Sequence, residues 1–581
     1  MSKQSSTISI NQIIPPPLQT IIFSQSSLVI LLLVATMIAL NYFDGHKKGT
    51  LARARWGGRR EKITARILAC KQIEARRLDE AALYIGSPKD TQVSFVDGKK
   101  IICIPKDPNT VYIPFASEHI LAIGRPGSGK TFSANDPLTR SGFDQGFTVL
   151  YYDFKGHEDP APSSKLMGYA IERGYKPYIL SPNSPETCVC NLLDFLNGPD
   201  DAEGAYQLAS VLNQNLKLDS SNSSSSNFFS QAGNFLIQAI LMLAKSSPYP
   251  DIAMCHKILA LPNLVNRLQS ANLAQYTKVV FDNYLSSAGS PETAASIATT
   301  AGLLFTRFMT PQTLAAFCGK TTLPLDVDGK YFIVFRMDPK IRNLIGPLMA
   351  SAIHLMVNRN VFRKRHTPLV CSLDEIGSID LIMLTDWLNL LRSSGFIGIL
   401  GTQSFGYLEQ TYGKDRLDAI VGGCTTQLIF QLNDQRTAEY YIKQLGNEDV
   451  LYKMKSRSRG KDGSSISLAD HIQTRPLLEI QEIQQFVKGK CILLNPGYGI
   501  PKKEIRIPML KTINIPQHDL TSMEKSKANW PEIKASLIKS STARAPADAH
   551  LMIREWEAKV MLSLPEERQQ TNKVLQTLSH Y

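Results

Sequence analysis

The stretch SEHILAIGRPGSGKT (117–131) decides the fold of this chain. Its last eight residues fit the pattern G-x-x-x-x-G-K-[ST] of a phosphate-binding loop. In such a loop, backbone N–H groups surround nucleotide phosphates, the Lys reaches the β- and γ-phosphates, and the final hydroxyl holds Mg²⁺. The sequence therefore predicts a site for ATP and Mg²⁺, formed by Gly124, Arg125, Pro126, Gly127, Ser128, Gly129, Lys130 and Thr131.

The residues around the loop fit the same interpretation. The apolar run HILAI (119–123) is typical of a short buried strand, and the residues from Thr131 onward can begin a helix. Strand, loop and helix in that order are the context that the pattern requires. A chance match is expected only roughly 0.02 times in a chain of this length at average amino-acid usage.

Further strand-like runs alternate with helical patterns, which indicates an α/β fold with a mostly parallel sheet. Together with the first run they predict roughly eight strands, at 119–123, 148–154, 177–180, 330–337, 368–375, 395–403, 426–432 and 490–497. Between 191 and 328 the strand-like runs almost vanish and the apolar spacing becomes helical. This segment predicts an all-α insertion within the α/β domain.

The stretch PLVCSLDEIGSI (368–379) supplies a second half for the active site. Its apolar run ends in Asp374 and Glu375, at the carboxyl end of a strand, where ligands bind in open α/β sheets. Asp374 suits Mg²⁺, and Glu375 suits the general base that activates a water molecule. Gln403 ends the next apolar run and is a candidate sensor of the γ-phosphate, although a satisfied amide at a strand end would look the same.

An arginine finger is expected if such domains assemble in a ring, because a positive charge stabilises the transition state of phosphoryl transfer. Arg392 and Arg436 are the candidates. Either residue could equally form a surface ion pair, and the sequence leaves that alternative open.

The N-terminal segment indicates a membrane anchor. Residues 4–43 contain no charged residue, and about 21–43 are apolar enough to form one transmembrane helix. Eleven Lys and Arg against two Glu follow between His46 and Arg77. This bias predicts an inner or plasma membrane protein, single-pass, with the bulk of the chain in the cytoplasm.

The net charge of +13 is weak evidence for a DNA-binding surface, because most of the surplus lies in that same short segment beside the anchor. The nine Cys form no C-x-x-C pair or Cys/His cluster, so the sequence indicates neither a zinc site nor a disulfide framework.

These observations divide the chain into six parts. They are an N-terminal segment with the transmembrane helix (1–45), a basic juxtamembrane segment and linker (46–117), the first part of the nucleotide-binding domain (118–190), the all-α insertion (191–328), the second part of the nucleotide-binding domain (329–510) and a polar C-terminal tail (511–581).

Several blocks of the sequence, in order, resemble the VirD4/TraG-type coupling proteins of type IV secretion and conjugation. They are GTLARARWGGRREK (49–62), EHILAIGRPGSGKT (118–131), YYDFKG (151–156), CNLLDF (190–195), LDEIGSI (373–379), GILGTQS (398–404), LNDQRTAEYYIKQLG (432–446) and RPLLEIQEI (475–483). The resemblance implies a RecA-like ATPase domain, a membrane anchor and a homo-hexameric ring. It also implies DNA, carried by a relaxase complex, and secretion-channel components as partners. The family often has two transmembrane helices, whereas this chain shows one apolar span.

Three functions remain open at this point. The first is a coupling ATPase for conjugative DNA transfer, and the second is the same scaffold selecting protein effectors. The third is a membrane docking platform in which nucleotide binding drives assembly without translocation. Lys130, Thr131, Asp374 and Glu375 together argue against the third, because a platform that does not hydrolyse ATP needs no catalytic carboxylate.

Overall fold

The computed structural model describes residues 54–86, 93–96, 99–102, 110–216, 224–460, 463–500, 505–540 and 547–567. It divides into two units, one of residues up to Arg55 with Lys443–Leu477, the other of Trp56–Ile442 with Leu478–Tyr581. The transmembrane helix expected at about 21–43 lies outside the described residues. Within the described ranges, no helix combines the length and the apolar character that crossing a membrane requires.

A nine-stranded sheet forms the centre of the larger unit, in the order β17-β14-β11-β5-β10-β9-β6-β8-β7. From β11 to β7 neighbouring strands are parallel, whereas β14 runs antiparallel to both of its neighbours. The strands are β5 (Ile120–Ile123), β6 (Thr148–Asp153), β7 (Lys176–Leu180), β8 (Tyr331–Arg336), β9 (Leu369–Leu373), β10 (Phe396–Thr402), β11 (Thr426–Ile429), β14 (Lys490–Leu494) and β17 (Met509–Thr512).

All eight predicted strands are confirmed, and the mostly parallel α/β sheet with them. The central strands β5, β9 and β10 are buried at every residue. Strands covered by helices on both faces consist of nearly continuous apolar runs, so these strands could be predicted from the sequence. β17 was not predicted, since its four residues include an exposed Thr and a Lys.

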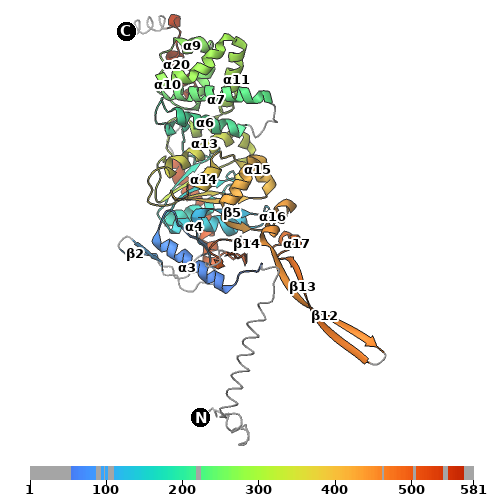
Figure 1. Cartoon of the computed structure of the whole chain (residues 1–581). Helices are drawn as coiled ribbons and strands as arrows, with labels where there is room; N and C mark the ends of the chain where they lie inside the picture. Colours follow the sequence, from blue (N-terminus) through green and yellow to red (C-terminus); the bar gives the residue numbers. More distant parts are fainter. Residues whose placement is uncertain are drawn as a thin grey trace, which may run out of the picture. The chain divides into compact units, whose positions relative to one another are not determined.

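Helices cover the faces of this sheet (Figure 1). α4 packs against β6 and β9, α5 against β7, and both α14 and α15 against β10. The helices that belong to the sheet's connections are α4 (Asp136–Asp144), α5 (Ser164–Glu172), α13 (Arg342–Val361), α14 (Leu384–Leu390), α15 (Phe405–Gly423), α16 (Gln435–Leu445) and α17 (Ile480–Gln484), with the short turns η3 (Thr131–Asn135), η7 (Pro339–Ile341) and η8 (Ile376–Ser378).

Between β7 and β8, the described part of the chain contains helices and no strand. The helices are η4 (Leu192–Phe195), α6 (Ala202–Leu216), α7 (Ser224–Lys245), α8 (Ile252–Leu259), α9 (Leu264–Ser270), α10 (Gln275–Ser286), η6 (Ser287–Gly289), α11 (Pro291–Arg307) and α12 (Pro311–Phe317). Local chemistry begins several of them. Asp251, Ser290 and Thr310 each accept a backbone N–H at a helix N-terminus, and Pro follows directly at α11 and α12.

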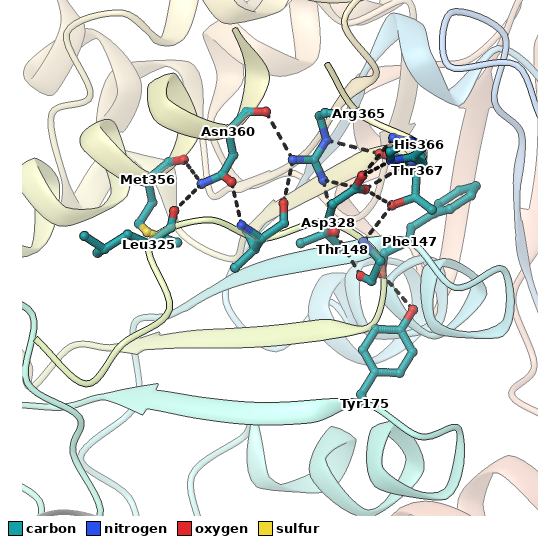
Figure 2. A network of polar contacts seen from close by, with 12 residues as sticks. Phe147, Thr148, Tyr175, Leu325, Asp328, Met356, Asn360, Arg365, His366 and Thr367 are labelled. Carbon is teal, nitrogen blue, oxygen red and sulfur yellow. Dashed lines mark hydrogen bonds and ion pairs between the residues drawn. The ribbon is translucent and has the colours of Figure 1, made fainter. Parts of the chain in front are cut away.

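A buried polar network fixes the point where the chain leaves these helices and enters β8 (Figure 2). The Arg365 guanidinium donates to the carbonyl oxygens of Val327 and Asn360, at 2.8 and 3.1 Å, and to the Thr148 hydroxyl at 3.0 Å. The Asn360 side chain in turn accepts from the Val327 N–H at 2.7 Å. One guanidinium therefore joins the end of the insertion, the end of α13 and the start of β6.

The segment predicted as a polar tail packs against the rest of the larger unit. α18 (Gln517–Ala528) and α19 (Trp530–Ser540) contact α5, and α20 (Ala547–Met561) contacts α8 of the insertion. The Arg140–Asp519 ion pair, 3.1 Å, is buried on both sides. These contacts fix two parts of the chain that lie far apart in sequence.

The residues before the phosphate-binding loop form α3 (Arg59–Ala75) and two antiparallel pairs. β1 (Leu83–Ile85) pairs with β4 (Val111–Ile113), and β2 (Val93–Val96) pairs with β3 (Lys99–Ile102). The turn η2 (Ala116–Glu118) leads into β5, and a further short pair joins β15 (Gly499–Ile500) to β16 (Ile505–Arg506).

The smaller unit is built on a long antiparallel hairpin of β12 (Asn447–Gly460) and β13 (Gly463–Pro476). Its register runs without interruption from Asn447 opposite Pro476 to Gly460 opposite Gly463. At its base the Ala54 N–H donates to the Asn447 carbonyl at 3.0 Å.

Candidate nucleotide-binding site

The phosphate-binding loop lies between β5 and η3, and its glycines take positions that other residues could not. Gly127 and Gly129 have φ of +80° and +100°, which side-chain-bearing residues rarely adopt. A Cβ on Gly124 would lie 2.7 Å from the Phe430 Cβ and 3.1 Å from the Gln431 carbonyl oxygen. The loop therefore passes directly against the residues that follow β11.

Lys130 and Thr131 point into the same buried region as Asp374. The Lys130 ammonium donates to the Gly124 carbonyl within its own loop. The Thr131 hydroxyl donates to Asp374 Oδ1 at 2.6 Å, and the Asn135 amide reaches the same oxygen at 3.3 Å. Thr131 and Asp374, predicted separately as Mg²⁺ ligands, therefore lie in direct contact.

Glu375 and Gln403 also lie together. β9 and β10 are parallel, with Leu373 opposite Leu400, so the residues that follow the two strands emerge at one edge of the sheet. The Gln403 amide donates to Glu375 Oε2 at 3.0 Å. The other carboxylate oxygen of Glu375 is buried and has no hydrogen-bond partner.

Burial opposes charge on the three ionisable side chains of this cluster. It raises the pKa of Glu375 to about 7 and raises the pKa of Asp374, although the hydrogen bond from Thr131 lowers the latter. It lowers the pKa of Lys130, against the attraction of Glu375 and Asp374. A bound polyphosphate with a divalent cation would supply the opposite charges that such buried groups need.

The residues fit a nucleotide with Mg²⁺. Ser128 Oγ, Asn135 Oδ1 and Glu375 Oε1 are buried polar atoms without a partner, and all three lie in or beside the loop–Asp374 cluster. The described residues contain no group of three or more His, Cys, Asp or Glu arranged to hold a metal. Mg²⁺ in phosphate sites commonly takes one or two protein oxygens together with the substrate's phosphates, which Thr131 and Asp374 can provide.

The two candidate arginine fingers are paired within this chain. Arg392 forms an ion pair with Glu118 at 2.6 Å and donates to the Asp79 carbonyl at 3.3 Å. It precedes β10, whose seven residues span roughly 20 Å, so it lies at the sheet edge opposite Gln403. Arg436 is exposed on α16 and pairs with Glu409.

Sequence reasoning missed residues whose importance depends on contacts between strands. A Cβ on Gly401 would lie 2.2 Å from the Asp374 carbonyl oxygen and 2.7 Å from Asn135 Nδ2, so only glycine fits there. Gln431 accepts from the Arg125 side chain at 2.7 Å and braces the loop. Asn135 is the exception. It follows Thr131 by four residues, so it lies on the same side of the helical turn, and this spacing could have identified it.

Comparison with known proteins finds a family model that matches part of the chain and solved structures with a similar fold. The family model described as the TraM recognition site of TraD and TraG matches residues 368–488. The conjugal transfer protein TraG of Rhizobium radiobacter is 25% identical over 176 residues, and that of Agrobacterium fabrum is 27% identical over 179. Each match covers 29% of this chain, and the chain spans about a quarter of the length of these relatives, 27% and 26%.

Solved structures of the conjugative coupling protein TrwB share the fold. The complex of TrwB with ADP and Mg²⁺ matches with a TM-score of 0.53 at 15% identity, covering 74% of this chain and 90% of that one. The complex with a non-hydrolysable ATP analogue gives 0.51 at 16% identity, covering 75% and 94%. These structural matches confirm the RecA-like P-loop fold of the sheet domain. The family model and the TraG relatives confirm the resemblance to VirD4/TraG-type coupling proteins.

Proposed function

We propose that this chain is a membrane-anchored ATPase that couples ATP hydrolysis to the recruitment and transfer of DNA through a type IV secretion or conjugation channel. The observation that carries the proposal is the buried, unpartnered oxygen of Glu375 beside Lys130, Thr131 and Asp374. A free carboxylate oxygen at that position suits a water molecule about to attack a phosphate.

Each residue of the cluster has a role in this proposal. Lys130 binds the β- and γ-phosphates of ATP, and Thr131 and Asp374 hold Mg²⁺, which supplies charge stabilisation when bound. Glu375 orients the attacking water and accepts its proton at Oε1. Gln403 donates a hydrogen bond to Glu375 Oε2, so a movement of β10 would displace the Glu375 carboxylate.

The transfer function is supported by the comparisons. The model of a recognition site in TraD and TraG covers 368–488, which includes both acidic residues, and the matched relatives are conjugal transfer proteins. We propose a relaxase–DNA complex and channel components as partners. In a homo-hexameric ring, Arg392 or Arg436 would reach the site of a neighbouring subunit as the arginine finger.

The anchor remains part of the proposal. Residues 21–43 would form a single transmembrane helix in the inner or plasma membrane, with the described residues on the cytoplasmic side. ATP and Mg²⁺ are the proposed ligands, in keeping with the TrwB complexes with ADP and Mg²⁺ and with an ATP analogue.

Two alternatives separate cleanly by experiment. The same scaffold could select protein effectors, an alternative that the small positive charge outside the juxtamembrane segment leaves open. A docking platform without translocation would bind ATP and hydrolyse it slowly, whatever its partner.

The deciding experiment measures ATP turnover by the purified full-length protein, at concentrations where it assembles, with and without single- and double-stranded DNA. A DNA motor should be stimulated by DNA, and its DNA affinity should fall steeply with salt and depend little on sequence. Assembled protein that neither binds DNA nor responds to it would contradict the DNA-transfer function and leave protein effectors as the leading alternative.

A further inference from the structure

The backbone that follows Glu375 is held at its start by the nucleotide-binding domain itself. The Ser378 hydroxyl donates to the Glu375 carbonyl at 2.6 Å and lies 2.8 Å from the Tyr152 hydroxyl on β6. Both side chains are buried. The backbone carbonyl of the proposed base is therefore tied to β6, which lies beside β9 in the sheet.

α15 holds the next residues from one side. The Thr411 hydroxyl donates to the Gly377 carbonyl at 2.6 Å, and the Tyr412 hydroxyl donates to the Ile379 carbonyl at 2.8 Å. Arg416 on the same helix forms an ion pair with Asp380 at 2.8 Å. The contacts come from both sides of the break in α15 at Gly413, with Thr411 and Tyr412 before it and Arg416 after it.

The all-α insertion holds the same segment from the other side. The Asn215 side chain on α6 pairs with the backbone of Asp380 in both directions. It accepts from the Asp380 N–H at 3.1 Å and donates to the Asp380 carbonyl at 2.8 Å. The neighbouring Gln214 donates to the Asp380 carboxylate at 3.1 Å. Asp380 is only 2% exposed, so these contacts are shielded from water.

Polar contacts join α6 to this segment. Beside Asp380 a cleft of about 810 Å³ is lined by residues of α6 and α15, including Gln207, Ser210 and Gln410. The helix α6 itself packs against α7 and α13. Asn215 and Gln214 therefore carry direct polar contacts from the insertion to the residues after Glu375.

We propose that Asn215 and Gln214 are positioning residues for Glu375, and that through them the all-α insertion controls ATP turnover. A shift of α6 would displace Asp380. The five residues 376–380, which follow Glu375, would transmit this displacement to the Glu375 carboxylate. The proposal rests on the proposed role of Glu375 as base. It extends that function by naming the route along which a substrate bound to the insertion acts on the active site.

The effect of breaking this clamp follows from geometry. A catalytic group displaced by about 1 Å can lose roughly 10² in rate. Asn215 does not contact the phosphate-binding loop, so nucleotide binding should not depend on it. We therefore expect Asn215→Ala to lower kcat by about tenfold or more while KM for ATP stays within about twofold, because losing an interaction that acts only in the transition state lowers kcat without raising KM.

The test compares full-length Asn215→Ala and Gln214→Ala with Gln207→Ala, a control on the same helix that lines the cleft. Turnover, KM for ATP and the melting temperature are measured for each. Gln207→Ala should behave as wild type. Gln214→Ala should show a smaller fall than Asn215→Ala, because it removes one hydrogen bond to Asp380 whereas Asn215→Ala removes two. Gln214→Ala also keeps the test decisive if Asn215→Ala folds poorly, since it removes a single hydrogen bond.

A double-mutant cycle with Glu375→Gln separates positioning from a general structural effect. If Asn215 acts through Glu375, Asn215→Ala should cause no further loss in the Glu375→Gln background. An equal loss in both backgrounds, or a wild-type kcat for both Asn215→Ala and Gln214→Ala, would overturn the proposal. A wild-type rate for Glu375→Gln alone would instead remove the assignment of the base, on which this proposal rests.

Discussion

At the scale of single residues, Lys130 and Glu375 lie in one buried cluster and should fail in different ways. Glu375→Gln keeps the size of the side chain and its contact with Gln403 but removes the proton acceptor. We expect ATP binding to be retained while hydrolysis falls by roughly 10²–10⁴. Lys130→Ala removes the charge that faces the phosphates, so binding itself should weaken. Nucleotide titration and turnover measurements on both variants distinguish the two results.

A matched control for these variants is Glu439→Gln, which makes the same chemical change at an exposed position on α16. It should leave both binding and turnover unchanged. Glu375 is not the base if Glu375→Gln hydrolyses ATP at the wild-type rate.

The sequence predicted those site residues that belong to one short, recognisable segment. Lys130 and Thr131 belong to one loop, and Asp374 and Glu375 end one apolar run. The contact between Thr131 and Asp374 follows from the edge that parallel strands share. Gly401 and Gln431 were not predictable in this way, because their importance arises only where neighbouring strands and loops approach within van der Waals distance.

At the scale of secondary-structure elements, the sequence predicted the buried elements and missed the exposed ones. Strands covered on both faces were predicted from unbroken apolar runs. The hairpin of β12 and β13 was missed, because KMKSRSRG (453–460) has many charges and no apolar alternation. The helices α18 and α19 were not predicted for a similar reason: α18 carries several charged side chains, and the buried Arg140–Asp519 ion pair that fixes it is a long-range contact.

The junction of the insertion with β8 offers a test of how such elements are joined. The Arg365 guanidinium satisfies two buried carbonyl groups and a hydroxyl from three segments (Figure 2). Lys carries one compact ammonium and cannot reach all of them. We expect Arg365→Lys to lower the free energy of unfolding by about 2–4 kcal/mol, because buried acceptors lose their partners. Urea unfolding monitored by circular dichroism measures the change.

The neighbouring Arg363 provides the comparison. It is exposed and pairs with Asp326 at the surface, where an ion pair contributes at most about 1 kcal/mol. The free energy of unfolding of Arg363→Lys should therefore lie within about 0.5 kcal/mol of the wild-type value. Equal midpoints for Arg365→Lys and Arg363→Lys would contradict the structural role of the network.

At the scale of the whole molecule, the larger unit is tied together by its last described helix. The chain passes from the sheet through α18 and α19 and returns to the insertion as α20, where Arg554 pairs with Asp251. Both side chains are at most 2% exposed. Asp251 also accepts the Met254 N–H at the start of α8, so one carboxylate begins α8 and binds α20.

Truncation after Ser540 removes α20 and leaves the Asp251 carboxylate buried without its guanidinium. Breaking a buried ion pair from one side costs about 3–5 kcal/mol. The loss should be local, since α8 belongs to the insertion while the sheet keeps its own core. We expect amide hydrogen exchange in α8 to accelerate by about 10²-fold, with the amides of β6 and β9 serving as the unchanged internal control.

The point variant Arg554→Met, which keeps α20 in place, should give a similar acceleration if the ion pair is the cause. Exchange in α8 at the full-length rate in both variants would show that α20 does not stabilise the insertion.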